Sequence, residues 1–161
     1  MTTPGTLHLM CGKIAAGTST LTCQLADAPG TVLLSEDHLL ARLYPGEINR
    51  VADYIRCSAR LRDVIASHVE ALLRGGVSVV LDFPANTVGT RAWMRSLFEV
   101  AQADHRLHYP DVPDEVCRAR LRARNATGEH DYQASDAEFD LLTSYFVPPT
   151  PAEGFNIVRH P

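Results

Sequence analysis

The sequence has little lysine and no excess of positive charge, which excludes one large class of binding proteins. Lys13 is the only lysine among 15 basic residues, and the formal net charge is −4 at pH 7. A protein that holds duplex DNA by bulk electrostatics needs the opposite balance. Local anion sites, built from a few arginines or from backbone N–H groups, stay compatible with this composition.

The sequence also lacks closely spaced cysteines, long apolar runs and an N-terminal signal pattern. Its four cysteines are far apart and form no C-x-x-C pair, which argues against a disulfide framework and a zinc site. The seven histidines show no metal-ligand spacing and are predicted to be scattered structural or surface groups. We therefore expect neither export nor a membrane span, and a cytoplasmic location.

Length and patterning predict one α/β domain over residues 1–161. With 45% hydrophobic and 21% charged residues, the composition is that of an ordinary globular domain. Short apolar runs predict strands at residues 7–11, 31–35, 77–82, 106–109 and 155–158. Helices are predicted between them, at residues 19–26, 39–43, 48–74, 90–103, 114–124 and 135–145. Strands that alternate with helices imply a five-stranded parallel sheet, with a ligand beyond the carboxyl ends of its strands.

The longest predicted helix, residues 48–74, should bury one face. Its apolar positions approximate the three- and four-residue spacing of such a face: Val51, Tyr54, Ile55, Leu61, Val64, Ile65, Val69, Leu72 and Leu73. A polar stretch at residues 125–134 predicts a mobile loop, and a capping box at Ser135 and Glu138 opens the helix that follows.

The turn after the first predicted strand fits a phosphate-binding loop in all but one position. It consists of Gly12, Lys13, Ile14, Ala15, Ala16, Gly17, Thr18, Ser19 and Thr20. The pattern G-x-x-x-x-G-K-[ST] holds an anion on backbone N–H groups and a helix N-terminus. Ser19 occupies the position of the magnesium-binding hydroxyl. A plain glycine turn is the alternative, but the strand before the turn, the helix after it and the acids downstream favour the phosphate loop.

Thr18 is the exception, because it stands where the pattern has the lysine that reaches the β- and γ-phosphates. Threonine supplies neither charge nor reach, and losing one such donor costs about 3–4 kcal/mol, or roughly 10²–10³ in rate. The threonine is either a natural or an engineered substitution. Lys13, just after the first glycine, either compensates in part or points to solvent.

Four segments together resemble the small bacterial P-loop kinases: residues 9–20, 35–37, 79–86 and 112–124. The chain is similar to a group of ATP-binding proteins without a settled substrate. More distantly it resembles zeta toxins, chloramphenicol phosphotransferase, gluconate kinase and polynucleotide 5′-kinases. The resemblance covers nearly the whole chain. It implies a P-loop NTPase fold with three α/β/α layers, a helical lid at about residues 118–145, and ATP with Mg²⁺ as ligands. It is unspecific for the phosphate acceptor.

Two acids follow predicted strands and are candidates for the chemistry. In kinases of this resemblance, the aspartate that matches Asp37 accepts the proton of the acceptor hydroxyl; the adjacent Glu36 is less favoured for this role. Alternatively, Asp37 caps the short helix predicted at residue 39. Asp82 ends the third strand as a Walker B acid does, and would hold magnesium through water beside the Ser19 hydroxyl. Alternatively, Asp82 is a buried turn acid.

Arginine pairs supply the predicted positive charge. Arg120 and Arg124 are four residues apart on one helix face and resemble the lid arginines that clamp ATP phosphates. Arg118 and Arg122 lie on the other side of that helix, where a solvated face is the simpler interpretation.

Four further residues are candidates for binding an acceptor. Arg56 and Arg60 form a second pair at four-residue spacing, suited to an anionic substrate. Asn86 and Arg91 follow the third strand and would face an acceptor beyond the sheet. Solvent-exposed surface is the alternative for all four residues.

Three functions follow from these residues. The first is an ATP-dependent kinase of a small-molecule hydroxyl, impaired by Thr18. The second is a non-catalytic protein that binds a nucleotide or a partner and has abandoned the lysine. The third is a nucleic-acid 5′-hydroxyl kinase, against which the net charge of −4 and the lack of an aromatic-studded basic groove argue.

Overall fold

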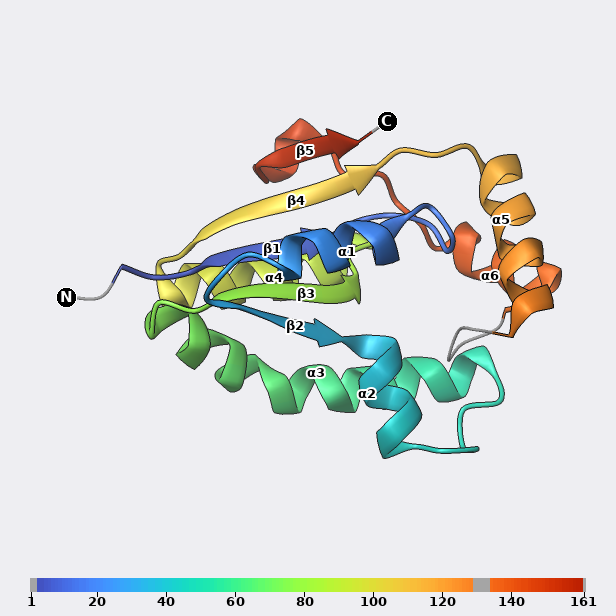
Figure 1. The fold of residues 1–161 in the computed structure, drawn as a ribbon, viewed down its shortest axis with the longest axis horizontal. Helices are drawn as coiled ribbons and strands as arrows, with labels where there is room; N and C mark the ends of the chain where they lie inside the picture. The colour runs from blue at the N-terminus through green and yellow to red at the C-terminus, as the bar shows by residue number, and fades with distance from the viewer. Residues whose placement is uncertain (1–2, 129–133, 161) are drawn as a thin grey trace.

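A five-stranded parallel sheet forms the centre of the computed structural model, which describes residues 3–128 and 134–160 (Figure 1). The strands lie in the order β2-β3-β1-β4-β5, and every neighbouring pair is parallel. Their bounds are β1 (Thr6–Met10), β2 (Thr31–Ser35), β3 (Ser78–Pro84), β4 (Asp104–Pro110) and β5 (Ile157–His160). The predicted parallel sheet is therefore confirmed.

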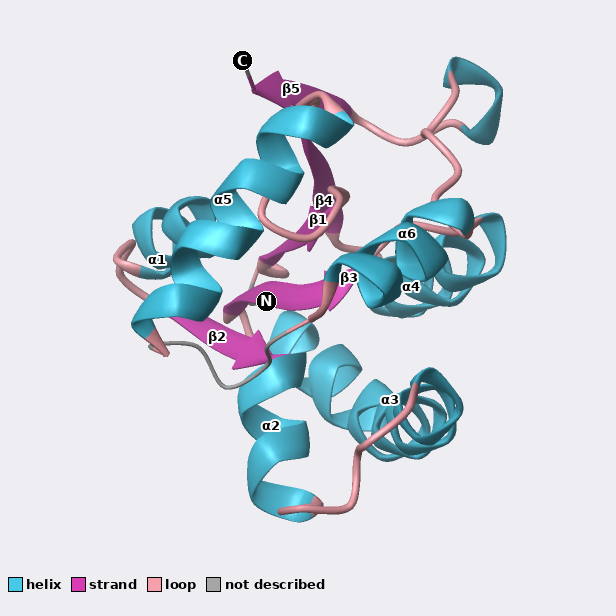
Figure 2. Ribbon diagram, turned by 90° about the vertical axis from the view of Figure 1, so that its right-hand side faces the viewer, coloured by secondary structure: helices cyan, strands magenta, loops and turns pink. Residues whose placement is uncertain are grey.

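Helices cover both faces of the sheet and its carboxyl edge. They are α1 (Thr18–Ala26), α2 (Glu36–Leu43), α3 (Val51–Arg74), α4 (Val88–Ala101), α5 (Asp114–Thr127) and α6 (Asp136–Ser144), with a short 3₁₀ turn η1 (Pro151–Glu153). Figure 2 shows α1 on one side of the sheet and α3 and α4 on the other, which confirms the three layers. α5 and α6 lie beyond the ends of the strands (Figure 1). Among the described residues, no helix is long and apolar enough to cross a membrane.

The buried face of α3 differs in part from the predicted one. Its core stripe runs at four-residue spacing through Cys57, Leu61, Ile65, Val69 and Leu73, all of them buried. The prediction was wrong for Val64 and Ile55, whose side chains are 73% and 52% exposed. Several near-equivalent apolar stripes fit a helix of this length, and only the position of the sheet selects one.

Element boundaries differ from the predictions where polar side chains cap helices. α2 begins at Glu36, because the Ser35 hydroxyl accepts a hydrogen bond from the His38 N–H. Asp37 therefore lies in the first turn of α2 and is not its cap. The capping box at Ser135 and Glu138 is confirmed. α5 continues to Thr127, so the predicted loop at residues 125–134 begins too early, and its residues 129–133 lie outside the described ones.

Three histidines form a hydrogen-bonded row across β1, β4 and β5, and are not scattered as predicted. His8 Nδ1 lies 3.0 Å from His108 Nε2, and His108 Nδ1 lies 3.0 Å from His160 Nε2. Burial, together with the nearby His8, His160 and Arg106, lowers the pKa of His108 to about 4. Each hydrogen bond needs one N–H and one lone pair, so a neutral His108 donates to one of its two neighbours and accepts from the other.

The row predicts a loss of stability in mild acid. The unfolded chain takes up a proton at His108 near pH 6.5, whereas the folded chain does so only near pH 4. Stability from this residue is therefore lost as the pH falls through this range. In urea unfolding curves, the free energy of unfolding of the wild-type protein should exceed that of His108→Asn by more at pH 7.5 than at pH 5. We expect this difference to shrink by roughly 1–2 kcal/mol between the two pH values. Replacement of the exposed His68 by asparagine should leave the wild-type trend unchanged. A wild-type advantage that does not vary with pH would contradict the prediction.

Candidate functional site

A cavity of about 420 Å³ opens at the carboxyl edge of the sheet. It lies where parallel-sheet proteins bind ligands. The turn between β1 and α1, the start of α2, one side of α3 and the end of β3 form its walls, and α5 and α6 contribute Arg124 and Leu142. Most of the predicted site residues are brought together here.

The turn between β1 and α1, residues 11–17, has the backbone of a tight loop. Gly17 has φ 99° and Ala15 has φ 63°, both in the left-handed region. The Ala16 N–H donates to the Lys13 carbonyl over 3.0 Å, which closes the turn. No side chain caps the first turn of α1, which leaves the N–H groups of that turn to a ligand or to water.

Most of the predicted phosphate-loop residues line the cavity: Gly12, Lys13, Ile14, Ala15, Thr18 and Ser19. Ala16 is buried in an apolar cluster that includes Val112 and Leu121. Gly17 and Thr20 do not line the cavity. A Cβ on Gly12 would lie 3.2 Å from the Thr18 methyl carbon, so these two residues are closely packed.

The Lys13 ammonium already has partners within the protein. Its ammonium lies 2.5 Å from an Asp114 carboxylate oxygen at the start of α5 and 5.7 Å from the centre of the Phe146 ring. Its side chain is only 13% exposed, so it does not point to solvent. Lys13 would have to give up Asp114 in order to replace the missing lysine at position 18.

Asp37, in the first turn of α2, and Asp82, on β3, line the same cavity. Ser35, two residues before Asp37, is paired with Asp82 in the ladder between β2 and β3. Burial and, to a smaller extent, the Asp37 carboxylate raise the pKa of Asp82 to about 6. Two crowded carboxyls and the Ser19 hydroxyl form an all-oxygen donor set, which suits Mg²⁺. The residues present therefore fit the metal that phosphoryl transfer uses.

Glu36 is a third acid in the cavity wall, although the sequence pattern favours Asp37 over it. Its side chain is 3% exposed and accepts hydrogen bonds from the Tyr54 hydroxyl and, over 2.6 Å, from the Ser58 hydroxyl. Burial raises the pKa of Glu36 to about 7, although these two hydrogen bonds oppose the shift. At neutral pH this carboxyl is therefore partly protonated.

Asn86 clamps the phosphate loop. Its side-chain oxygen accepts from the Gly12 N–H over 3.0 Å, and its side-chain NH₂ donates to the Gly12 carbonyl over 2.9 Å. Asn86 also lines the cavity. Both the oxygen and the NH₂ of the Asn86 side chain are hydrogen-bonded to Gly12, so Asn86 positions the loop. We predicted instead that Asn86 would face an acceptor.

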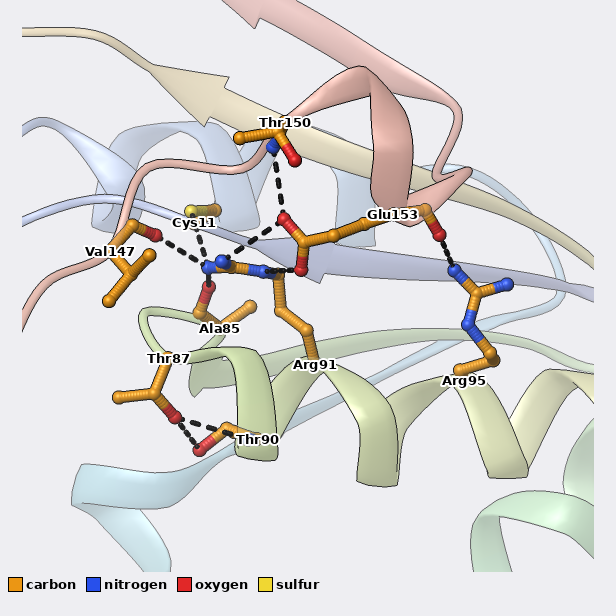
Figure 3. Close-up of polar contacts among 9 residues, drawn as sticks. All are labelled: Cys11, Ala85, Thr87, Thr90, Arg91, Arg95, Val147, Thr150 and Glu153. Carbon is orange, nitrogen blue, oxygen red and sulfur yellow. Dashed lines mark hydrogen bonds and ion pairs between the residues drawn. The ribbon is translucent and has the colours of Figure 1, made fainter.

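Arg91 does not face an acceptor, and that prediction was wrong. Its side chain is fully buried, and its guanidinium donates to the Glu153 carboxylate over 2.8 Å and to the carbonyls of Ala85 and Val147 over 2.9 and 2.8 Å (Figure 3). It joins α4 to the turn after β3 and to the segment before β5. A sequence does not distinguish a buried arginine from an exposed one when its carboxylate partner is distant along the chain.

Arg56 and Arg60 also lie outside the cavity, on the exposed side of α3. Arg56 forms a surface ion pair with Asp53. The cavity is instead lined by Tyr54, Ser58 and Arg62, which recur at four-residue spacing beside the core stripe. This spacing is visible in the sequence, but only the structure shows that the stripe faces the cavity.

The arginines of α5 separate into two sets. Arg118 and Arg122 bond Asp140 and Asp136 of α6. Arg124 lines the cavity, and Arg120 Nη1 would lie 3.8 Å from a Cβ on Gly17, directly over the phosphate loop. The structure therefore places Arg120 and Arg124 on the loop side of α5.

Comparisons with known proteins agree with this geometry. A family described as an AAA domain matches residues 7–149. A candidate kinase from Chloroflexus aurantiacus superposes with a TM-score of 0.77 at 22% identity, covering 99% of this chain and 86% of that one. Chaetomium thermophilum Kti12 in complex with ADP-AlF3 gives 0.73 at 15% identity, with 96% and 88% covered. Mycobacterium tuberculosis APS kinase CysC in complex with AMPPNP and APS gives 0.60 at 18%, with 91% and 84% covered. A search of curated proteins gave no match.

The buried ion pair predicts a large loss of stability on removal of either partner. Glu153→Gln leaves the charge of Arg91 in the interior without its carboxylate, so the free energy of unfolding should fall by about 3 kcal/mol, measured in urea. Arg122→Gln, which breaks an exposed pair, should cost far less. If Glu153→Gln and Arg122→Gln lowered the free energy of unfolding equally, the buried pair at Arg91 would stabilise the protein no more than the exposed pair does.

Proposed function

This chain belongs to the AAA domain family that matches residues 7–149, a P-loop kinase-like family, and on this basis we propose that it is an ATP-dependent phosphotransferase acting on a small-molecule hydroxyl. One observation carries the proposal: the phosphate loop, Asp37, Asp82 and Ser19 all line a single cavity beyond the sheet. Phosphoryl transfer requires positioned phosphates, a cation and a group that orients the acceptor hydroxyl.

Each residue then has a definite task. The loop backbone and the N-terminus of α1 bind the β- and γ-phosphates of ATP. The acceptor oxygen bonds to the γ-phosphorus as the bond to the β–γ bridging oxygen breaks, and the hydroxyl proton passes to Asp37. ADP leaves, and Arg120 and Arg124 stabilise the charge that develops on the transferred group. Ser19 and Asp82 would hold Mg²⁺, which neutralises phosphate charge when bound.

Thr18 favours a second candidate, a nucleotide-binding protein that does not turn over. The loop backbone and Ser19 remain without the lysine, so binding of MgATP should persist while the charge aimed at the transferring phosphate is lost. Lys13 is paired with Asp114 and would have to leave this carboxylate to replace the lysine missing at position 18.

Thr18→Lys separates the two candidates. The first candidate predicts that this variant gains phosphate transfer or ATP hydrolysis by roughly 10²–10³ over the unchanged chain, measured as ADP release. Thr18→Gln is the matched control, because it supplies length without charge, and it should gain little. If Thr18→Lys binds MgATP in calorimetry but neither hydrolyses nor transfers it, the non-catalytic candidate holds.

Asp37→Asn, placed in the Thr18→Lys protein, tests the base. Loss of the carboxylate removes the proton acceptor, so kcat should fall by about 10²–10⁴ while MgATP affinity stays within a few-fold. Asp27→Asn, at the exposed end of α1, carries the same charge change and should leave kcat as it is. An unchanged kcat in Asp37→Asn would show that Asp37 is not the proton acceptor.

A further inference from the structure

The side of the cavity away from the phosphate loop is built by α3. Tyr54, Ser58 and Arg62 are spaced four residues apart, so they form one line along the helix, and all three line the cavity. The core stripe of Cys57, Leu61 and Ile65 lies next to this line. Figure 2 shows that α3 lies on the opposite side of the sheet from α1, whose N-terminus closes the phosphate loop. This wall of the cavity therefore faces whatever lies beyond the phosphates.

Two of the three polar side chains in this line already form hydrogen bonds within the protein. The hydroxyls of Tyr54 and Ser58 both donate to the buried Glu36 carboxyl. Arg62 is different. Its Nη1 donates to the Thr90 hydroxyl over 3.3 Å, and its guanidinium lies 5.8 Å from the centre of the Trp93 ring. Within the described residues, no carboxylate oxygen lies within 4.0 Å of Arg62.

The other cations of the cavity have different positions. Lys13 is paired with Asp114, and Arg124 comes from α5, on the loop side. Arg62 is therefore the cation of the α3 wall. Thr90 and Trp93 contact its guanidinium without neutralising its charge. The Arg62 charge counteracts the rise in the pKa of the buried Glu36, but the two residues form no ion pair. A planar guanidinium is suited to binding a carboxylate or a phosphate through two parallel hydrogen bonds.

The walls around Arg62 limit the size and character of a ligand. Ile55, Phe83 and Leu142 supply apolar surface, and the whole cavity, including the part beside the phosphate loop, holds about 420 Å³. A molecule of a few carbons would fit in this space beside the phosphates of a nucleotide. The Asp37 carboxylate opens onto the same space.

We propose that Arg62 binds the anionic group of the phosphate acceptor, and that the acceptor is a small alcohol carrying a carboxylate or a phosphate. This proposal rests on the kinase function proposed above. With its anion on Arg62, the acceptor presents its hydroxyl to Asp37 and to the γ-phosphate. Arg62 is thus a specificity-determining residue, in the role that the sequence pattern predicts for Arg56 and Arg60.

Matched pairs of alcohols test the proposal. Glycerol 3-phosphate is compared with glycerol, glycerate with glycerol, and gluconate with glucitol, each with MgATP and the Thr18→Lys protein. ADP release is the readout. The anionic member of at least one pair should be used with a kcat/KM roughly 10- to 100-fold above that of its neutral partner, because hydrogen bonds to charged groups contribute most. Binding of the same compounds to the unchanged chain is followed by ligand-observed NMR.

Variants of Arg62 assign the preference to this residue. Arg62→Gln should bring the ratio between the anionic and neutral members close to one, mainly by raising KM. Arg62→Lys should restore part of the ratio, which loss of structure alone would not do. Arg74→Gln, an equal charge change at the exposed far end of α3, should keep the wild-type ratio.

The possible failures can be told apart. If no MgATP binds, the proposed function fails and the acceptor proposal fails with it. If MgATP binds but neutral alcohols are used or bound as well as anionic ones, or if no alcohol of the panel is used or bound, only the acceptor proposal is overturned. An anion preference that survives in Arg62→Gln likewise overturns the acceptor proposal alone.

Discussion

The shape of the phosphate loop depends on a positive charge in the interior of the protein. Arg91 is fully buried, and removing a guanidinium from water costs several kcal/mol unless other groups replace its hydration. Glu153 and the carbonyls of Ala85 and Val147 do so (Figure 3). Because Asn86 directly follows Ala85 and clamps Gly12, the ion pair fixes the turn that holds the loop. A carboxylate near the C-terminus thus controls a site near the N-terminus.

A second constraint is the charge balance of the cavity. Asp37, Asp82 and Glu36 are close enough that the pKa values of both Asp82 and Glu36 rise, mainly through burial and in part through Asp37. A nucleotide would add several negative charges to this region. With threonine at position 18, backbone N–H groups and the dipole of α1 must hold the phosphates beside these acids without a lysine. Threonine at position 18 therefore removes more than one contact to a phosphate, because the positive charge of a lysine there would also offset the negative charge of the carboxylates.

The sequence predicted the strands and the loop around the cavity, but it did not predict which α3 residues line the cavity. The reasons are physical. Strands such as β1 and β2 are short apolar runs, and the position of Asp82 near the carboxyl edge follows from chain direction, although β3 continues past the predicted end at Asp82 to Pro84. Arg62 and Arg91 resemble Arg60 in the sequence, since all three are arginines within predicted helices. Their roles depend on partners that are distant along the chain, Thr90 for Arg62 and Glu153 for Arg91, and no local pattern encodes those contacts.

The two stripes of α3 suggest how one fold can serve different acceptors. Cys57, Leu61 and Ile65 pack into the core, whereas Ser58 and Arg62 line the cavity one position further along the helix. A change in the cavity stripe alters the chemistry of the wall without creating a void in the core, which is where large destabilisation arises. The helix that follows the phosphate loop, α1, lies on the far side of the sheet from α3 (Figure 2). The proposed acceptor site and the proposed nucleotide site are therefore built by separate elements, so that a substitution in one need not disturb the other.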